Sequence, residues 1–578
     1  MKSLPLSRRW GALQSWRHQL TVPQFTVITG LIVIALGTLL MASPLCSQDS
    51  VGLWEALFTV TSAITVTGLS IIDVGQELTL VGQLLLLALL ITGGLGLMAI
   101  TTFLQGFVQG HAGLRSRVDK GRALDEFGVG GIGPTFNGIL ITGSCVMLLG
   151  TLVLYSFGFT DISNPLRRFW ASLFHAISAY NNAGFGLWSD SLSRYRDNTV
   201  VNATVAALVV VGGIGWRVIN DLWGNRNRLN RLKRLSLHTR LVLRSSGLLI
   251  VVGCLGLLFT EQFATGGVMQ PLQWIQKLQV SLFQAISART AGFNTVPLST
   301  ATFSDAGLLL LIVLMFIGAS PGGTGGGIKT TTFATLMGAT RSTLQGRQEV
   351  VIHQRQIPAT VVLRAIGVTI ASLLFVLLMA LLLGLGPTSS GTTGLERFSF
   401  LEKLFTCMSA FGTVGLDLGV TAQLNRWGQL VLMVGMFVGR LGILLLLSAV
   451  YGSRPQPRVG YPREELYPNP FIATRSSHPV HRRRRPQIHG QLVALEPRRG
   501  HGPGRIRRDR RGPLRHRRVQ RADQGRCRCA GDRQQPESRG CPAAGGSGHP
   551  GPGGGLHRRG GPARGGRAGC GDGGGGHE

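Results

Sequence analysis

The sequence is poor in acidic residues and lacks the side-chain arrangements that enzymes use. Its 578 residues include 26 Asp and Glu against 58 Lys and Arg. We find no Ser-His-Asp set, no paired catalytic carboxylates and no Cys or His spacing typical of zinc. The cysteines in the apolar part of the chain are scattered and are expected to pack rather than bind metal: Cys46, Cys145, Cys254 and Cys407. The sequence therefore does not favour an enzyme.

The excess of positive charge is unevenly distributed. A formal net charge of +32 would suggest a nucleic-acid-binding protein if it were spread over the chain. Much of it lies instead beyond residue 453, in a tail rich in Arg, Gly and Pro that contains no Lys. The first 450 residues contain long uncharged apolar stretches, each able to cross a hydrocarbon core of about 30 Å. These features indicate a membrane protein with a separate basic tail.

Eight apolar segments are candidate membrane spans, and they fall into four pairs. The spans cover 22–42, 78–103, 136–159, 198–219, 241–260, 306–337 with an interruption, 361–385 and 428–449. The first span is long for the core of a signal peptide and is followed by further spans, so we expect it to stay in the protein.

The loops on one side of these spans are basic. The charged positions are Lys2, Arg8, Arg9 and Arg17 at the N-terminus, and Arg115, Arg117, Lys120, Arg122, Arg226, Arg228, Arg231, Lys233, Arg234, Arg341, Arg347 and Arg355 after the second, fourth and sixth spans. Because basic loops remain on the cytoplasmic side, both termini are predicted to lie in the cytoplasm.

A short pattern recurs four times, each time between the two spans of a pair. It has Phe, then Ser-Ala four residues later, then Gly followed by Leu or Phe. The four copies are Phe58, Ser62 and Gly68; Phe174, Ser178 and Gly184; Phe283, Ser287 and Gly292; Phe405, Ser409 and Gly415. Ordinary interfacial loops are the alternative, but a pattern repeated four times on the same side favours four re-entrant pore loops.

Four re-entrant loops predict a pore. Non-helical backbone is tolerated at membrane depth only where it is buried in protein or lines a wet cavity. Backbone carbonyls can replace the water around a cation, and Gly gives the backbone the freedom to turn them inward. The predicted ion-binding residues are Thr67, Gly68, Ala183, Gly184, Ala291, Gly292, Val414 and Gly415. Each loop has one shared Gly where the TVGYG loop of potassium channels has two, which predicts a shorter filter of modest selectivity.

The predicted fold is an all-α membrane protein of four tandem helix–pore loop–helix units around a pseudo-fourfold pore. The units are expected at 1–110, 111–225, 226–345 and 346–467, and the tail at 468–578. The short helix before each loop would point its negative carboxyl end at the axis and so favour a cation.

The second span of the third unit is interrupted by a Gly-rich segment. Residues 308–338 are apolar at both ends but contain Pro321 and five glycines between them. We expect this stretch to unwind beside a cavity below the filter, without regular hydrogen bonding, and to act as a gate. The predicted gating residues here are Gly322, Gly323, Thr324, Gly325, Gly326, Gly327 and Lys329. A phosphate-binding loop is disfavoured, because Ile328 separates Gly327 from Lys329 and no strand precedes the segment.

A single charge lies within the last apolar span. Arg440 occupies the position at which the first two units have Gly94 and Gly213. A lone charge in this environment costs at least about 2.5 kcal/mol, so it needs a partner or a function. We expect Arg440 to face the pore, contact carbonyls of the Gly-rich loop and raise the barrier to K⁺. The alternative is an Arg that extends to the cytoplasmic interface.

The sequence resembles the Trk/Ktr/HKT superfamily of potassium transporters, most closely its Ktr B-type ion-translocating subunits. The resemblance covers about residues 20–467 and rests on the four loops, the eight-span plan, the interrupted span and Arg440. It implies K⁺ uptake across a bacterial plasma membrane by a homodimer in which each protomer has its own pore. It also implies an intramembrane gating loop and a cytoplasmic regulatory ring that binds nucleotide, with no covalently bound cofactor. In that family Gly at all four filter positions goes with K⁺ preference, whereas Ser in the first loop goes with Na⁺ permeation; this chain has Gly68 there. Dependence of the flux on Na⁺ is left open.

The tail beyond residue 467 has too few apolar residues to form a core. Two interpretations remain: a disordered basic arm, or out-of-frame translation of GC-rich DNA, which the composition favours. Two other function classes also remain open. A secondary transporter would place inverted repeats around a midplane site, and a nucleic-acid-binding membrane anchor would need a functional tail.

Overall fold

Helices make up almost the whole of the part of the chain that the structure describes. The computed structural model describes residues 22–48, 51–94, 132–226, 235–264, 267–347, 349–385 and 398–451. All of them belong to one unit of the chain, Met1–Arg463. The basic tail, the N-terminal basic residues, the link at 115–122, the basic residues at 228–234 and the end of the second predicted span lie outside the described residues.

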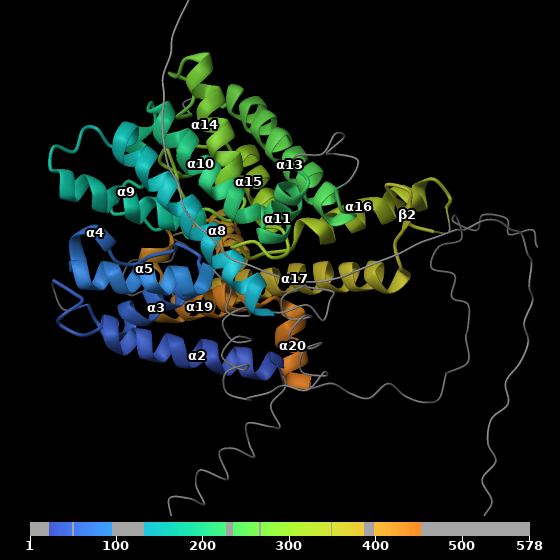
Figure 1. Cartoon of the computed structure of the whole chain (residues 1–578), viewed down its shortest axis with the longest axis horizontal. Helices are drawn as coiled ribbons and strands as arrows, with labels where there is room; N and C mark the ends of the chain where they lie inside the picture. The colour runs from blue at the N-terminus through green and yellow to red at the C-terminus, as the bar shows by residue number, and fades with distance from the viewer. Residues whose placement is uncertain are drawn as a thin grey trace, which may run out of the picture. The chain divides into compact units, whose positions relative to one another are not determined.

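Each quarter of this unit has the same order of helices: a long helix, a short helix and a second apolar helix (Figure 1). The first quarter has α2 (Val22–Met41), α3 (Leu53–Thr65), the single-turn α4 (Val74–Glu77) and α5 (Leu80–Gly94). The second has α8 (Ile132–Val153) with the π-turn η1 (Leu154–Gly158), α9 (Pro165–Tyr180), the 3₁₀ turn η2 (Ser193–Tyr195), α10 (Thr199–Ile214) and α11 (Trp216–Gly224).

The other two quarters repeat this order with two additions. The third has α13 (Leu237–Gln262), α14 (Trp274–Ser287), α15 (Asp305–Phe316) and α16 (Thr330–Leu344). A small hairpin of β1 (Val351–Ile352) and β2 (Arg355–Gln356) then leads into the fourth, with α17 (Ala359–Leu385), α18 (Phe400–Gly412), the 3₁₀ turn η3 (Thr421–Gln423), α19 (Arg426–Leu441) and α20 (Ile443–Tyr451).

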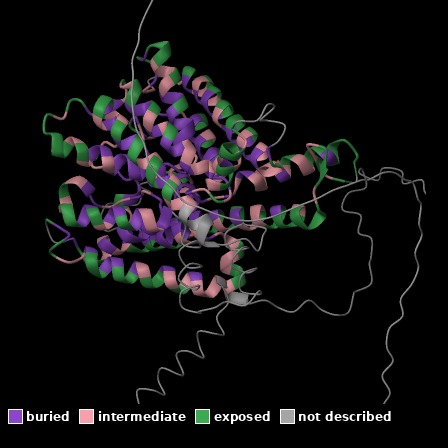
Figure 2. Cartoon of the chain, viewed as in Figure 1, coloured by how far each residue is buried: buried purple, intermediate pink, exposed green. Residues whose placement is uncertain are grey.

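The long helices have the composition and length of membrane spans. Four pass that test as single helices, namely Pro23–Met41, Gly138–Gly158, Leu237–Gln262 and Ala359–Leu385. They leave large apolar side chains exposed, with Leu36 57% and Leu374 61% exposed. The short helices are the buried ones, and Figure 2 shows this contrast between a buried interior and an exposed outer layer. Their repeated Phe side chains are at most 4% exposed: Phe58, Phe174, Phe283 and Phe405. Lipid contact outside and protein contact inside explain both patterns.

Side chains near the start of the short helices tie neighbouring quarters together. The indole of Trp54 on α3 donates to Gln429 Oε1 on α19 at 2.6 Å. In the same way, Trp170 on α9 donates to Gln83 Oε1 on α5 at 2.6 Å. These two short helices are thus each fixed to the second apolar helix of a neighbouring quarter, α3 to that of the fourth quarter and α9 to that of the first.

Two of the predicted spans are not continuous helices, because the helix turns sharply inside them. The span predicted at 198–219 bends by 93° between α10 and α11, and the one at 428–449 bends by 94° between α19 and α20. Gly215 (φ +92°) and Gly442 (φ +83°) lie at the bends. Glycine adopts such angles without steric cost, and the apolar composition on both sides conceals the break from a hydropathy analysis. The span predicted at 306–337 is interrupted as expected, between Phe316 and Thr330.

Candidate functional site

The four repeated loops share two positive φ angles shortly after their short helices. In each loop the shared Gly and the residue two positions before it have positive φ angles. The pairs are Val66 (57°) and Gly68 (91°), Asn182 (57°) and Gly184 (69°), Thr290 (85°) and Gly292 (77°), and Thr413 (49°) and Gly415 (91°). Positive φ is a genuine outlier for β-branched residues and marks stored strain. The repeat in the sequence predicted the importance of the glycines. It did not predict that of the residue two positions before each Gly, because nothing in the identity of that residue indicates a left-handed backbone.

The shared glycines bring the four loops together in a closed ring. A Cβ built on Gly68 would overlap the carbonyl oxygen of Ala183, one on Gly292 that of Val414, and one on Gly415 that of Thr67. A Cβ on Gly184 would lie 2.9 Å from the carbonyl oxygen of Ala291. Each loop therefore abuts the next, from the first to the fourth and back to the first, and all eight residues predicted to bind the ion lie at these junctions.

The repeated serines form hydrogen bonds to the loops in two different ways. Ser62 Oγ and Ser409 Oγ each accept a hydrogen bond at 3.1 Å, from the N–H of Gly68 and of Gly415. Ser178 Oγ instead donates to the carbonyl of Phe185 at 2.7 Å, and Ser287 Oγ donates to that of Phe293 at 2.5 Å. All four serines are at most 1% exposed. These bonds explain why the sequence pattern includes Ser.

The Gly-rich segment between α15 and α16 is a hydrogen-bonded loop. Its base is closed by a parallel bridge between Ile317 and Ile328. Its further bonds reach another quarter, since Ser320 N–H donates to the carbonyl of Gly213 at 3.0 Å and Thr324 N–H to that of Gly212 at 3.1 Å. The sequence predicted a segment without regular hydrogen bonding. The bonds are indeed not helical, but the loop is fixed by its neighbours.

This loop lies directly against two of the four repeated loops. A Cβ on Gly325 would overlap the hydroxyl of Thr290, and one on Gly326 would overlap that of Thr413. Gly326 N–H also donates to Thr413 Oγ1 at 3.0 Å. Only glycine fits at such close contact, so Gly325 and Gly326 allow the Gly-rich loop to approach these two repeated loops closely. Lys329 turns back onto the same loop and donates from Nζ to the carbonyl of Gly325 at 2.9 Å.

Arg440 connects three quarters of the protein. Its guanidinium donates to the carbonyl of Thr324 in the Gly-rich loop and to the carbonyl of Gly93 at the end of α5. The carbonyl of Gly94 lies 3.5 Å from Nη2. We expected Arg440 to contact a carbonyl of the Gly-rich loop. We did not predict its bond to the first quarter. With these partners, Arg440 does not extend away to the interface.

A second half-buried arginine, which the sequence pattern did not single out, lies at the base of the Gly-rich loop. Arg289 follows the third short helix and donates to Ser246 Oγ on α13 at 3.2 Å and to the carbonyl of Gly318 at 3.5 Å. It precedes Thr290, whose φ is positive. Arg289 thus joins the third repeated loop to the start of the Gly-rich loop. Its position two residues after Ser287 in the repeat could have indicated that Arg289 lies near the ring.

Carboxylates beyond the repeated loops have local structural partners. Asp73 caps α4 by accepting from Gly75 N–H at 2.9 Å, and Asp417 accepts from Thr421 N–H at 3.3 Å. Asp190 pairs with Arg194 at 2.7 Å. Partial burial raises the pKa of Asp190, but the hydrogen bond and charge of Arg194 outweigh it and the pKa lies below the usual value. The described residues contain no group of three His, Cys, Asp or Glu side chains suited to a metal ion.

The comparison with known proteins identifies the family. Residues 7–459 match the model of the TrkH family, described as cation transport proteins. The chain belongs to the TrkH family. With apolar helices long enough to cross a bilayer, this TrkH-family chain is a membrane protein.

Relatives of this TrkH-family chain are described as uptake proteins. It is 34% identical over 447 residues to the Ktr system potassium uptake protein B of Bacillus subtilis, covering 77% of this chain and 96% of that protein. It is 31% identical over 454 residues to the potassium/sodium uptake protein NtpJ of Enterococcus hirae, covering 78% and 98%. The crystal structure of the potassium transporter TrkH from Vibrio parahaemolyticus has a similar fold, with a TM-score of 0.57 at 20% identity over 75% of this chain and 86% of that one.

Proposed function

We propose that this protein takes up K⁺ through the centre of the ring formed by its four repeated loops. The observation that carries the proposal is the junction of each shared glycine with the carbonyl of the next loop. An ion at the centre of such a ring exchanges its water for backbone oxygens from all four quarters. The relatives named as potassium uptake proteins support K⁺ as the ion.

The short helices favour a cation at this position. Each of α3, α9, α14 and α18 ends immediately before a repeated loop. The carboxyl end of a helix carries about half a negative elementary charge. Four such ends directed at one ring attract K⁺ and oppose an anion. The shared orientation of the four units supports a channel-like path over the inverted repeats of a secondary transporter.

The distribution of basic residues supports an orientation in the membrane. Among the described residues, Arg240 and Arg244 lie near the start of α13 and Arg341 lies near the end of α16. Arg347 and Arg355 follow α16 in the chain. We propose that this end faces the cytoplasm of a bacterial cell, which places both termini there. The eight spans then comprise the four long helices, the two bent pairs, α5 and the interrupted span that contains α15.

We further propose that the Gly-rich loop and Arg440 form the gate. The loop lies against Thr290 and Thr413 of the third and fourth repeated loops, and Arg440 joins its Thr324 carbonyl to the first quarter. Charge-assisted bonds of this kind stabilise the closed arrangement, and the guanidinium repels K⁺ at the constriction.

The regulation of this gate is proposed to come from a partner. The relatives named as Ktr system proteins support a system with partner subunits. We propose that the chain forms a homodimer on a cytoplasmic ring and that this ring binds the nucleotide. A ring that binds one loop arrangement a few kcal/mol more tightly than the other is sufficient to open the pore. One relative is named as a potassium/sodium uptake protein, so the dependence of K⁺ uptake on Na⁺ should also be measured.

The function is tested by growth of a K⁺-uptake-deficient bacterium at low K⁺, with a regulatory partner co-expressed. The full chain and a truncation after Tyr467 should both restore growth, because the repeated loops lie before that residue. Gly68→Ser should lower the ratio of K⁺ to Na⁺ uptake, since a side chain there meets the Ala183 carbonyl and adds a hydroxyl ligand. Gly247→Ala is the matched control, because a Cβ there meets nothing within 4 Å. An unchanged ratio in well-expressed Gly68→Ser would reject the ring as the filter.

The gate is tested by K⁺ flux into proteoliposomes with and without partner. Arg440→Ala and a loop shortened within 322–327 should each raise flux and weaken its dependence on the partner. The double variant should show less than the sum of both effects, because both changes release the same loop. If both single variants lower flux while selectivity is intact, the loop is a structural element of the pore and the gating proposal fails.

A further inference from the structure

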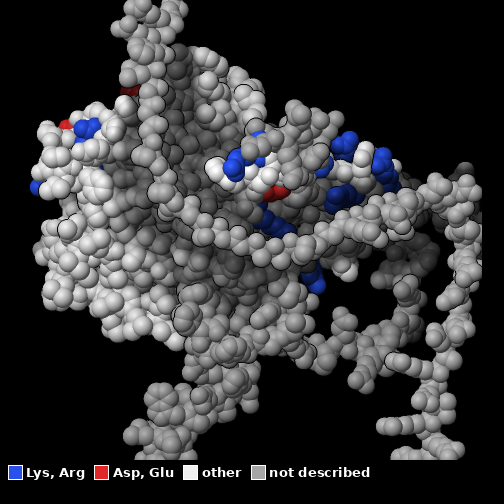
Figure 3. Space-filling model, viewed as in Figure 1, with Lys and Arg blue, Asp and Glu red and all other residues white. Residues whose placement is uncertain are grey.

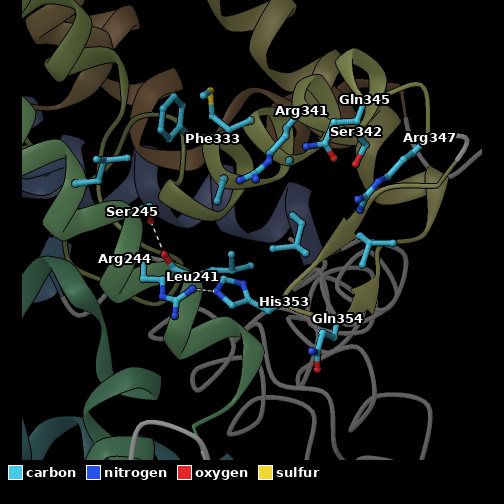
Figure 4. A pocket seen from close by; sticks show the side chains of 16 residues that line it. Leu241, Arg244, Ser245, Phe333, Arg341, Ser342, Gln345, Arg347, His353 and Gln354 are labelled. Carbon is cyan, nitrogen blue, oxygen red and sulfur yellow. Dashed lines mark hydrogen bonds between the residues drawn. The ribbon is translucent and has the colours of Figure 1, made fainter.

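A cavity of about 700 Å³ lies away from the ring, between α13, α16 and the β1–β2 hairpin. Figure 4 shows its lining side chains converging from these elements. One part of the wall is apolar, with Leu248 from α13 and Phe333 and Met337 from α16. Another part is basic, with Arg244, Arg341 and Arg347. None of the sixteen described residues that line the cavity is acidic.

The cavity lies where α13 leaves its apolar stretch. This helix has 26 residues, so at 1.5 Å per residue it is about 39 Å long against a hydrocarbon core of about 30 Å. Arg244 is its last basic residue, and the exposed side chains that follow are apolar, with Leu248 57% and Val251 55% exposed. In a bilayer centred on the apolar stretch of α13, the basic part of the wall lies at the level of lipid headgroups and the apolar part at the level of acyl chains. Figure 3 shows Lys and Arg gathered over this end of the unit.

The hairpin is held over the cavity in a strained conformation. His353 (φ 50°) and Gln354 (φ 63°) form its two-residue turn, with positive φ angles that usually require Asn or Gly. The imidazole Nε2 of His353 contacts the Arg244 guanidinium, and its Nδ1 is buried without a hydrogen-bond partner. Burial, together with the charges of Arg244 and Arg240, lowers the pKa of His353, so the ring is neutral at pH 7 and adds no charge of its own.

We propose that this cavity binds an anionic glycerophospholipid from the cytoplasmic leaflet. The phosphate is held by Arg244, Arg341 and Arg347, and an acyl chain lies along Leu248, Phe333 and Met337. A neutral lipid leaves three guanidinium groups without a counter-charge, and a soluble anion leaves the apolar wall empty. The proposal concerns a site other than the ring and does not depend on which ion the ring passes.

The proposal is tested by titrating the purified full chain in detergent with phosphatidylglycerol and counting bound lipid by native mass spectrometry. Phosphatidylcholine is the neutral competitor, and glycerol phosphate is the headgroup without acyl chains. Phosphatidylglycerol should bind in preference to both. Basic groups near an anionic membrane surface each contribute about fivefold in affinity, so Arg244→Gln/Arg341→Gln should weaken binding by about 30-fold.

The control removes two charges elsewhere on the same end of the protein. Arg226, stacked on Trp223, and Arg364, exposed on α17, do not line the cavity. Arg226→Gln/Arg364→Gln should bind phosphatidylglycerol within twofold of the parent protein, and Arg244→Lys/Arg341→Lys should retain most of the affinity. Equal losses in both Gln pairs would mean non-specific attraction to a basic surface. Glycerol phosphate binding as tightly as the lipid would mean a site for a soluble anion. Either result overturns the proposal.

Discussion

The first and fourth repeated loops differ from the second and third in how their serines are used. In the first pair the hydroxyl accepts from the N–H of the shared Gly, and in the second pair it donates to the carbonyl of the next residue. That next residue is Leu69 or Leu416 in the first pair and Phe185 or Phe293 in the second. The helix also ends differently, because its C-cap residue is left-handed only in α3 and α18. One sequence pattern therefore supports two versions of the same turn.

This difference shows that the ring has lower symmetry than its sequence repeat suggests. Adjacent loops, the fourth with the first and the second with the third, share a hydrogen-bond arrangement. The four loops of the ring thus form two pairs. The same substitution can therefore have different effects at the four junctions. The following experiments test how the loops differ, beginning with the largest expected effect.

Substitution of the shared glycines should be most damaging at the fourth loop. Gly415→Ala introduces a Cβ at φ +91° that overlaps the Thr67 carbonyl, whereas Gly184→Ala places one at φ +69° and 2.9 Å from the Ala291 carbonyl. The left-handed backbone alone costs about 1–2 kcal/mol for a non-glycine residue. We expect K⁺ uptake to fall at least about tenfold further in Gly415→Ala than in Gly184→Ala. Uptake is measured in proteoliposomes at equal inserted protein, with Gly247→Ala as control; equal losses would remove the distinction between the junctions.

Removal of the serine hydroxyls should have an intermediate effect that separates the two pairs. Ser62→Ala and Ser409→Ala each leave a Gly N–H without its acceptor, which costs about 1–3 kcal/mol. Ser178→Ala and Ser287→Ala leave a carbonyl, whose two lone pairs make it easier to satisfy elsewhere. The melting temperature in detergent and the ratio of K⁺ to Na⁺ uptake should therefore fall more in the first pair. The reverse order would show that the direction of these bonds does not determine the stability of the turn.

The contact with the Gly-rich loop should give the smallest effect. Thr413→Val removes the acceptor for Gly326 N–H, and one such bond contributes about 1 kcal/mol, or about fivefold in an equilibrium. We expect partner-free K⁺ flux to rise by up to that factor. Thr290→Val is the matched variant, because the Thr290 hydroxyl lies 3.1 Å from the amide of Asn182 and only packs on Gly325. If Thr290→Val raises flux as much, packing rather than the hydrogen bond holds the loop.

Much of this arrangement could be predicted from the sequence because it is carried by residue identity. The shared glycines, the interrupted span and the contact of Arg440 with a loop carbonyl all rest on residues that are costly anywhere else in a membrane helix. The bends at Gly215 and Gly442 could not be predicted, since glycines in an apolar membrane helix are also compatible with a straight one. The direction of the serine bonds depends on where a helix ends to within one residue, which no composition pattern determines.

A further part could not be predicted because it depends on which quarters become neighbours. The bond from Arg440 to Gly93 joins residues 347 positions apart. Arg289 was passed over for the same reason, since its partners Ser246 and Gly318 are distant in sequence. The sequence indicated that Arg440 needed partners, and only the folded chain determines which carbonyls those are.

The closed ring is built from one continuous chain, and this has a genetic consequence. In a channel assembled from four identical subunits, every substitution is introduced four times around the axis. Here a single codon change alters one quadrant and leaves three untouched. Arg440 shows what this permits: one guanidinium lies beside the Gly-rich loop, where the corresponding positions of the first two units hold Gly94 and Gly213. Four such charges around one axis would repel one another and exclude cations, whereas one charge leaves three quadrants without it.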